Sequence, residues 1–500
     1  MASFQQEQGR QTQEAAMASK QQPAVDHGLK AKLLSNLRYD GLWMEASGAL
    51  GDLGTFVPIV VALTLVTGLD LGTTLIFTGV YNILTGLLFG VPMPVQPMKT
   101  IAAVALTQGD HLSVPQIMAA GLCTSGLLFF LGVTRLMGLV QRLVPLPVVR
   151  GIQLSQGLAF AITAVKYIMK DQNFSKNKSL GKRQWLGLDG LFLALICFCF
   201  IVVVTGAGDN LVVHSPAVDG DHGHEQRGRE EEEEEAGSSR SAFRQRLEWV
   251  PTAMVVFMLG IVLTFIRRPS IAAHLKLGPT TPQVMHITKE DWRRGFVKAA
   301  VPQIPLSILN SVIAVCKLSN DLYPNKKKQV TATSVSTSVG LMNLVGCWFG
   351  ALPVCHGAGG LAGQWRFGAR SGAAVVMLGV GKLILGLLLG NSLVSILAGY
   401  PVGILGVLLL YAGVELAMTV RDMTRRGESF IVLLAAAISI SASNAALGFV
   451  ISLVVHMLLT VPDMRPSHIR HFLASRLFPS TSCWPKPRPP RSAISTSQPV

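Results

Sequence analysis

Polar side chains that could hold an anion lie among and just after a cluster of prolines, inside a strongly apolar part of the chain. The prolines are Pro92, Pro94 and Pro97, and the polar residues are Gln96, Lys99 and Thr100. A helix cannot continue through this stretch, because each proline lacks an N–H group and its ring clashes with the preceding turn. We therefore expect an extended break that leads into a short helix at about residues 96–106. The free N–H groups and partial positive charge of a helix N-terminus favour an anion, and the Lys99 ammonium adds to them.

A second break, at residues 349–363, resembles the first. Both begin with Phe-Gly, reach Pro-Val a few residues later and continue into small residues suited to a helix. Paired Gly/Pro interruptions in the two halves of a hydrophobic chain indicate the binding site of a transporter. Glycines let the backbone approach an ion closely. The candidate ligand groups in this break are His356, Gly357, Ala358, Gly359 and Gly360.

Each of these interpretations has a plainer alternative. The two breaks could be unrelated turns between membrane helices. Lys99 could extend to a membrane interface instead of a ligand, and His356 could cap a helix.

Further candidates lie in the apolar spans that precede the breaks. Thr55 and Gln303 occupy the first span of each half and could face the centre. Ionisable groups inside a membrane are functional candidates, so Asp52, Glu45 and Glu415 are candidates for coupling transport to an ion. The alternative is a helix-end charge or an ion pair, for example between Asp52 and Lys99.

The composition indicates a membrane protein. The 500 residues are 50% hydrophobic and 14% charged, whereas soluble domains carry about 25% charged residues. Many membrane helices account for this difference. The net charge of +15 is scattered between apolar runs, which fits membrane flanks better than nucleic-acid binding. The sequence has no zinc-site spacing, P-loop or nucleophile elbow, so we expect no metal, no cofactor and no enzymatic activity.

About twelve apolar segments form two comparable groups. The sequence predicts a disordered tail at 1–40, a first membrane repeat at 41–205, an acidic disordered linker at 206–248, the rest of the membrane domain with a second repeat at 249–463, and a disordered tail at 464–500. The linker contains six consecutive glutamates, a block of like charge that cannot bury apolar surface. The last apolar segment, 430–459, is long enough for two shorter passages.

Three stretches resemble the plant and algal molybdate transporters, which are related to the SulP sulfate transporters. They are residues 48–58, residues 92–103, and residues 353–364 with 366–370. The resemblance implies an all-α integral membrane fold of two inverted repeats, each of about seven transmembrane segments, as in SulP and uracil-type transporters. It also implies broken half-helices whose N-termini face the substrate. SulP proteins usually carry a cytoplasmic STAS domain, which we do not expect here.

The function that this resemblance implies is secondary active transport of molybdate by alternating access. A sulfate or general oxyanion carrier of the same fold is one alternative, and a membrane sensor or scaffold that does not transport is another. The expected partners are the molybdate oxyanion and the lipid bilayer, with a homodimer as an open alternative. The sequence leaves the plasma, vacuolar and mitochondrial membranes unresolved.

Overall fold

A computed structural model of the chain describes residues 29–39, 41–106, 111–174, 178–206, 250–324, 326 and 329–460. The predicted tail 464–500 lies outside the described residues, and so does the predicted linker 206–248 apart from Gly206. Within the predicted tail 1–40, the structure describes a helix, α2 (Leu29–Asn36), that the sequence analysis did not predict.

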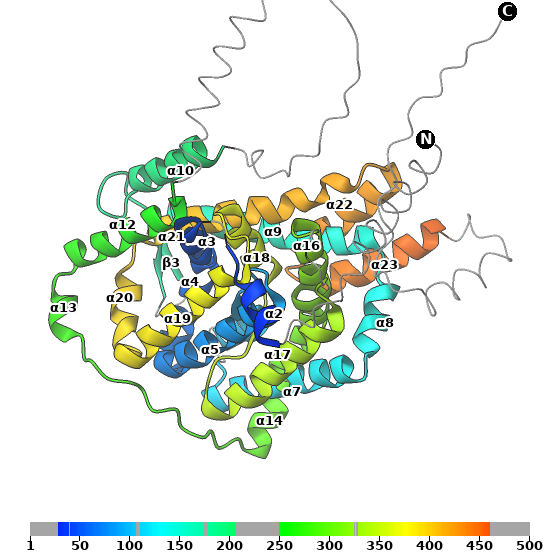
Figure 1. The fold of residues 1–500 in the computed structure, drawn as a ribbon, viewed down its shortest axis with the longest axis horizontal. Coiled ribbons are helices and arrows are strands. Elements are labelled where there is room, and N and C mark those ends of the chain that lie inside the picture. The colour runs from blue at the N-terminus through cyan, green and yellow to red at the C-terminus, as the bar shows by residue number, and fades with distance from the viewer. Residues whose placement is uncertain are drawn as a thin grey trace, which may run out of the picture.

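The described part of the chain is mostly helical (Figure 1). The first half contains α3 (Leu42–Leu50), α4 (Leu53–Thr67), α5 (Leu71–Phe89), β1 (Val95–Pro97), α6 (Lys99–Ala105), α7 (Val114–Val133), α8 (Leu136–Leu143), α9 (Leu146–Met169), β2 (Lys170–Asn173), β3 (Lys178–Lys182) and α10 (Leu191–Thr205). The second half contains α12 (Thr252–Arg267), α13 (Ser270–His274), α14 (Lys289–Gly295), α15 (Val301–Leu306), α16 (Val315–Leu322), α17 (Ala332–Gly346), β4 (Val354–His356), α18 (Ala358–Arg366), α19 (Gly372–Leu388), α20 (Leu393–Gly399), α21 (Val402–Ala417), α22 (Arg426–Ser441) and α23 (Ala445–Thr460).

Among the described residues, five helices are long and apolar enough to cross a membrane, or up to seven if each bent pair is one span. One bent pair is α3 and α4, which meet at 41°. The first apolar span is therefore bent near its start. Gly51 lies against the backbone of Gly363, since a β-carbon there would be 2.5 Å from the Gly363 carbonyl oxygen. This close approach places Asp52 at the break, as the N-cap of α4.

The helical stretch from Lys289 to Leu322 spans 34 residues despite two internal prolines. Pro302 and Pro305 lie in α15, and π-helical turns at Phe296–Ala300 and Ser307–Ala314 flank it. A proline removes an i→i−4 hydrogen bond, and a π-turn is one way to accommodate such a defect without ending the helix. The stretch places Gln303 in the middle of a membrane span.

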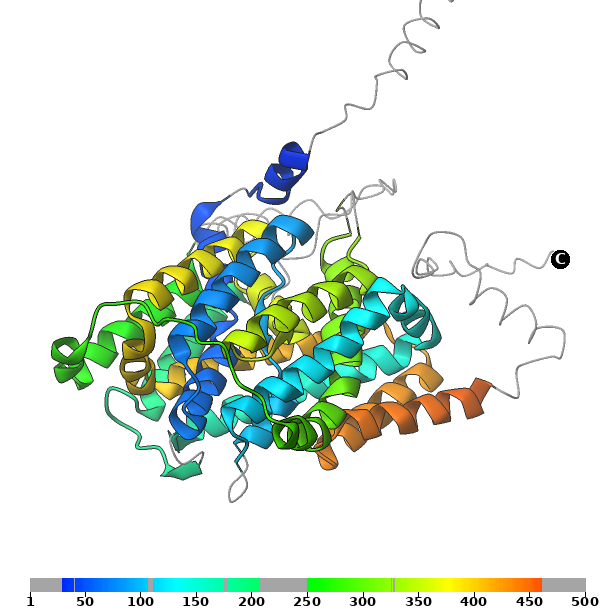
Figure 2. The same cartoon turned by 90° about the horizontal axis from the view of Figure 1, so that it is seen from below.

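Helices from the two halves pair in the fold. α5 packs along α19, α7 along α17, and α9 along α21 (Figures 1 and 2). In Figure 2, α5 in blue lies beside α19 in yellow, and α7 in cyan lies beside α17 in yellow-green. Gly79 and Gly379 let α5 and α19 touch, because a β-carbon on either would lie within 2.8 Å of the other's carbonyl oxygen. Each pair thus combines one helix from each half of the chain.

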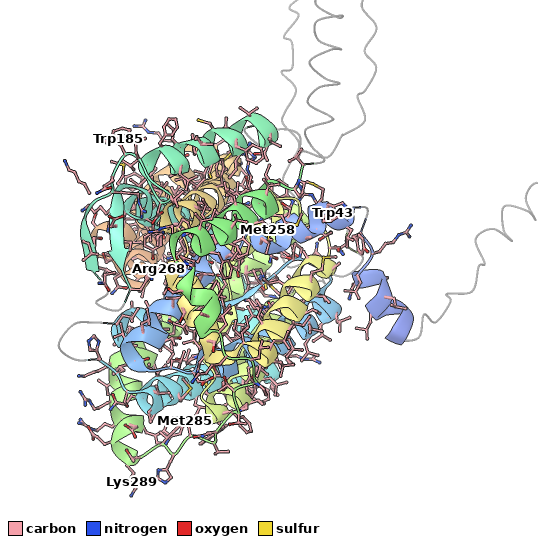
Figure 3. The ribbon with its side chains drawn as sticks, turned by 90° about the vertical axis from the view of Figure 1, so that its left-hand side faces the viewer. Trp43, Trp185, Met258, Arg268, Met285 and Lys289 are labelled. Atoms are coloured by element: carbon pink, nitrogen blue, oxygen red, sulfur yellow. The ribbon has the colours of Figure 1, made fainter. Side chains whose placement is uncertain are left out.

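Large apolar side chains cover the outside of these helices. Trp185 is 71% exposed and Met258 is 52% exposed, and Figure 3 shows both on the face formed by α10 and α12. The interior contains many buried polar groups, among them Asp52, Gln96 and Lys382. An apolar exterior and a partly polar interior fit a protein surrounded by lipid.

Candidate functional site

The two predicted breaks meet as a short antiparallel ladder at the centre of the fold. β1 pairs with β4, with Gln96 opposite Cys355 and Val95 opposite His356. The N–H of Met98 extends the ladder by donating to the Pro353 carbonyl at 2.9 Å. Prolines are tolerated here because each strand has only one neighbouring strand, so their missing N–H groups interrupt no second ladder.

An asparagine from the preceding long helix satisfies the outer edge of each strand. Asn82 of α5 accepts from the Val95 N–H at 2.8 Å. Asn343 of α17 accepts from the Val354 N–H at 2.7 Å and donates to its carbonyl at 2.6 Å. Buried backbone groups need such partners, so these two asparagines take the place of further strands. The equivalent arrangement supports the internal similarity of the two halves.

The predicted half-helices follow the strands directly. α18 begins after Gly357, which as the N-cap makes no side-chain capping hydrogen bond. α6 begins after Met98, and its first turn is covered by Gln303. The Gln303 Oε1 accepts from the N–H groups of Thr100 at 2.9 Å and Ile101 at 3.3 Å. The structure thus brings Thr100 and Gln303 together, although they are 203 positions apart in the chain.

Three of the predicted residues form one buried network beside the ladder. Thr55 donates to Asp52 Oδ1 at 2.7 Å. The Gln96 amide nitrogen donates to the same carboxylate oxygen and, at 2.7 Å, to Thr55 Oγ1. Asp52 is 1% exposed, and its Oδ2 has no hydrogen-bond partner among the described residues. One carboxylate oxygen is therefore fully engaged and the other is free.

The N-terminus of α18 closes over this network because two residues there, the N-cap Gly357 and Gly360, have no side chain. A β-carbon at Gly357 would lie 1.6 Å from Gln96 Oε1. A β-carbon at Gly360 would lie 2.5 Å from Gln96 Nε2 and 2.8 Å from Asp52 Oδ1. These contacts explain the glycines of the second break, and they place the α18 N-terminus directly against the polar network.

Two lysine ammonium groups are buried in the same region. Lys99 Nζ lies 3.8 Å from the ring centroid of Phe160, and Lys382 Nζ lies 3.5 Å from that of Phe56. Both nitrogens are buried, and neither has a hydrogen-bond partner among the described residues. Both lysines interact electrostatically with Asp52. The sequence analysis missed Lys382, although a lysine in the middle of the apolar span 373–389 is a signal that could have identified it.

Phe160 of α9 connects the two half-helices. Its ring faces Lys99 of α6, and a β-carbon at Gly359 of α18 would lie 1.9 Å from its Cε2 atom. An aromatic face attracts a cation through its quadrupole. In this structure the Phe160 ring therefore attracts the Lys99 ammonium group.

The side chain of His356 lies on the other side of the ladder. Side chains alternate along a strand, so His356 is grouped with Val95 and not with Gln96. Its Nε2 lies 3.3 Å from the Ser338 hydroxyl, and its ring stands edge-on to Phe89 with centroids 5.8 Å apart. The backbone of residues 357–360, including Ala358, remains beside the network.

The other two predicted carboxylates have arginine partners elsewhere. Glu45 Oε1 accepts from the backbone N–H of Arg370 at 3.0 Å. Glu415 Oε2 lies 4.0 Å from Arg366 Nη1 at the end of α18. The structure thus places Glu45 beside Arg370 and Glu415 beside Arg366, whereas the charged neighbours of Asp52 include Lys382 and Lys99.

No group of three or more His, Cys, Asp or Glu residues that could hold a metal ion occurs in the described part of the chain. The central site consists instead of amide, hydroxyl and ammonium groups around one carboxylate. Such a site can bind an anion by hydrogen bonding and charge.

The fold is similar to that of SLC26 anion transporters. A structure of the murine Slc26a9 anion transporter in the inward-facing state aligns with a TM-score of 0.53 and 14% identity, and the match covers 90% of this chain and 75% of that one. Another SLC26A9 structure aligns with a TM-score of 0.54 and 14% identity, covering 93% and 71%. At this identity the similarity concerns the fold alone, and it confirms the SulP-like architecture predicted from the sequence.

Sequence comparison identifies the family. A family model described as "Molybdate transporter of MFS superfamily" matches residues 44–160 and 295–416. Molybdate transporter 1 of Arabidopsis thaliana is 56% identical over 424 residues, covering 85% of this chain and 89% of that protein. Molybdate transporter 2 of the same plant is 56% identical over 432 residues, covering 86% and 90%. Molybdate transporter 1 of Chlamydomonas reinhardtii is 37% identical, covering 82% and 90%.

These relatives are transporters and not enzymes, and the apolar helices of the described structure fit an integral, multi-pass membrane protein. The chain belongs to the molybdate transporter family.

Proposed function

We propose that this chain carries molybdate across a membrane as a secondary active transporter that works by alternating access. The names of its relatives support molybdate as the substrate. The observation that carries the placement of the anion is the buried Lys99 ammonium, which has no hydrogen-bond partner among the described residues. It lies near the uncapped N-terminus of α18, with Phe160 in contact with both.

The proposed anion position is the space between Lys99, Gln96 and the first turn of α18. A tetrahedral dianion needs several hydrogen-bond donors and positive charge, and the N–H groups and dipole of a helix N-terminus provide both. Gly357, Gly359 and Gly360 allow close approach of that backbone. Asp52 and Thr55 would orient the Gln96 amide.

Thr100 and Gln303 have a different role in this proposal. The Gln303 amide oxygen caps the first turn of α6 in the present arrangement. It therefore shapes the wall of the site, and it could release these N–H groups to the anion. His356 would stabilise the second break from behind, through Ser338.

Alternating access requires two parts of the membrane domain to move against each other. We propose that α9 and α21 belong to one part and that α4, α6 and α18 carry the site on the other. Phe160 of α9 would then be a contact that changes during transport. We also retain 41–205 and 249–463 as the two membrane portions of the chain.

Sulfate transport is the second candidate, because sulfate has the same charge and shape as molybdate and the site residues suit either ion. Uptake into proteoliposomes separates the two. We expect saturable molybdate uptake that excess sulfate hardly reduces. Inhibition by an equal concentration of sulfate would indicate a general oxyanion carrier, and binding without uptake would indicate a sensor.

The Lys99→Gln variant tests the placement of the site, with Lys182→Gln as the matched control. Lys182 is exposed in β3, so its replacement leaves uptake unchanged. Loss of the Lys99 charge weakens molybdate uptake at least tenfold, since charged hydrogen bonds contribute about 1.5–3 kcal/mol each. Unchanged uptake by a correctly folded Lys99→Gln protein would refute this placement.

A further inference from the structure

Three charged side chains from three different segments share the centre of the membrane domain. Asp52 occupies the N-cap position of α4, Lys99 is the first residue of α6, and Lys382 lies in α19. Asp52 is 1% exposed and Lys382 is 4% exposed, and the Lys99 ammonium nitrogen is also buried. Lys382 faces Phe56, which lies one helical turn after Asp52 on the same face of α4.

The charges of this cluster do not cancel. With all three groups ionised, one carboxylate stands against two ammonium groups, which leaves one positive charge. A bound dianion would change this to one negative charge. Both states bury an unbalanced charge, which is strongly disfavoured in a low-dielectric interior. One added proton makes the occupied site neutral.

The hydrogen bonds indicate which atom could take that proton. Asp52 Oδ1 accepts from both Thr55 and Gln96. Asp52 Oδ2 is buried without a partner among the described residues. A proton on Oδ2 would leave the existing bonds to Oδ1 in place and would give the carboxyl group a donor to offer to an anion oxygen.

We propose that Asp52 takes up one proton at Oδ2 for each dianion bound, with Lys99 and Lys382 as the two fixed countercharges. This inference rests on the proposed function. The proton comes from water on the side where the anion enters, and it leaves with the anion on the other side. No bond other than the Oδ2–H bond forms or breaks. Transport is therefore symport of one dianion with one proton, and each cycle moves one net negative charge across the membrane.

Asp52 is surrounded by charged groups and by hydrogen-bonding side chains. Its charged neighbours are Lys382 and Lys99, and its hydrogen-bond partners are Thr55 and Gln96. Lys99 also interacts with the Cys355 thiol, which accepts a hydrogen bond from Ser311. Glu45 Oε2 is also buried without a hydrogen-bond partner in the described part of the chain, but Glu45 lies beside Arg370. Asp52 is the candidate carboxyl group that lies beside both Lys99 and Lys382, so it is in position to balance the bound anion.

Calorimetric titration of the purified full-length protein in detergent measures the proton directly. Sodium molybdate is titrated at one pH in two buffers with different heats of ionisation, and the difference in observed heat gives the protons bound per anion. We expect about one for the parent protein. Asp52→Asn imitates the protonated acid, so the molybdate that it binds, at whatever affinity, should bind without proton uptake. Glu290→Gln, an exposed carboxylate control, should behave like the parent.

Two substitutions of Lys382 test whether its positive charge contributes to anion binding. Lys382→Gln should weaken molybdate binding at least tenfold, because the occupied site would then carry a net negative charge. Lys382→Arg should restore most of the affinity, and Lys182→Gln is the neutral control. Size-exclusion profiles and melting temperatures establish that each variant is folded.

The outcomes separate the two proposals. Saturable molybdate binding by the parent without proton uptake would overturn this inference and leave the proposed function intact. Equal affinity of Lys382→Gln and the parent would also overturn it. Absence of molybdate and sulfate binding by the folded parent would overturn the proposed function and this inference together. If the Lys382 variants do not fold, the proton count of the parent still decides.

Discussion

Replacement of Gly360 by alanine tests whether the contact between α18 and the polar network is as close as the structure indicates. The added β-carbon would lie 2.5 Å from Gln96 Nε2, 2.6 Å from Pro94 Cγ and 2.8 Å from Asp52 Oδ1. Pro94 belongs to the central break and cannot rotate away. The methyl group must therefore displace Gln96 or separate α18 from the ladder.

These contacts give the size of the free-energy loss expected for Gly360→Ala. Overpacking of a tight site costs about 1–3 kcal/mol. Moving the Gln96 amide away leaves buried polar atoms without partners, which costs a further 1–3 kcal/mol or so. The higher helix propensity of alanine offsets up to about 1 kcal/mol. The net loss of folding stability is about 3 kcal/mol. The same displacement moves Gln96, a proposed ligand, and α18 out of position, and a loss of this size in binding free energy corresponds to about two orders of magnitude in affinity.

Gly126→Ala is the matched control, because Gly126 is also helical and a β-carbon there would meet nothing within 4 Å. We expect Gly126→Ala to retain the parent KM for molybdate and its melting temperature. Gly360→Ala should raise the KM about 100-fold and lower the melting temperature. Uptake into proteoliposomes and thermal unfolding in detergent measure the two quantities. If both variants match the parent, α18 does not lie against Gln96 and the proposed site is wrong.

Two further substitutions test the supports of the site. Asn343→Ala removes both side-chain hydrogen bonds to the Val354 backbone and leaves two backbone groups unpaired. We expect a loss of about 2–4 kcal/mol in stability, which thermal unfolding would detect as a lower melting temperature. An unchanged melting temperature would contradict the role of Asn343. Phe160→Leu removes the aromatic face that competes with an anion for the Lys99 ammonium group. Such cation–aromatic contacts contribute about 0.5–2 kcal/mol. Molybdate binding should therefore tighten about 2- to 30-fold, as measured by calorimetric titration. Weaker binding would show that the ring supports the site instead of occupying it.

Local chemistry determined much of the architecture before any contact was known. The prolines and glycines of the two breaks set the ends of α5, the extended strands and the starts of α6 and α18 within a few residues. The segment predicted at 430–459 as two passages is α22 and α23. These features follow from the missing N–H of proline and the freedom of glycine, which act within one turn of the chain.

Tertiary structure alone decided how these pieces meet. The sequence placed two extended breaks in the chain but did not indicate that they pair as β1 and β4. It identified Gln303 as a candidate but not as the cap of α6, 203 residues away. It did not identify Phe160 at all, since an aromatic residue in an apolar helix has the same local pattern whether it faces lipid or a buried lysine.

For the candidate site too, the sequence identified individual residues and the fold showed which of them lie together. Asp52, Thr55 and Gln96 were separate candidates in the sequence, and the fold joins them into one hydrogen-bonded network, while it places Glu45 and Glu415 with arginines. The fold also brings Lys382 of α19 to this site, where its ammonium group lies against Phe56 of α4. Sequence patterns record the conformational preferences of neighbouring residues. The charge balance of a buried site depends on side chains that packing brings together from distant segments, so only the tertiary structure decides it.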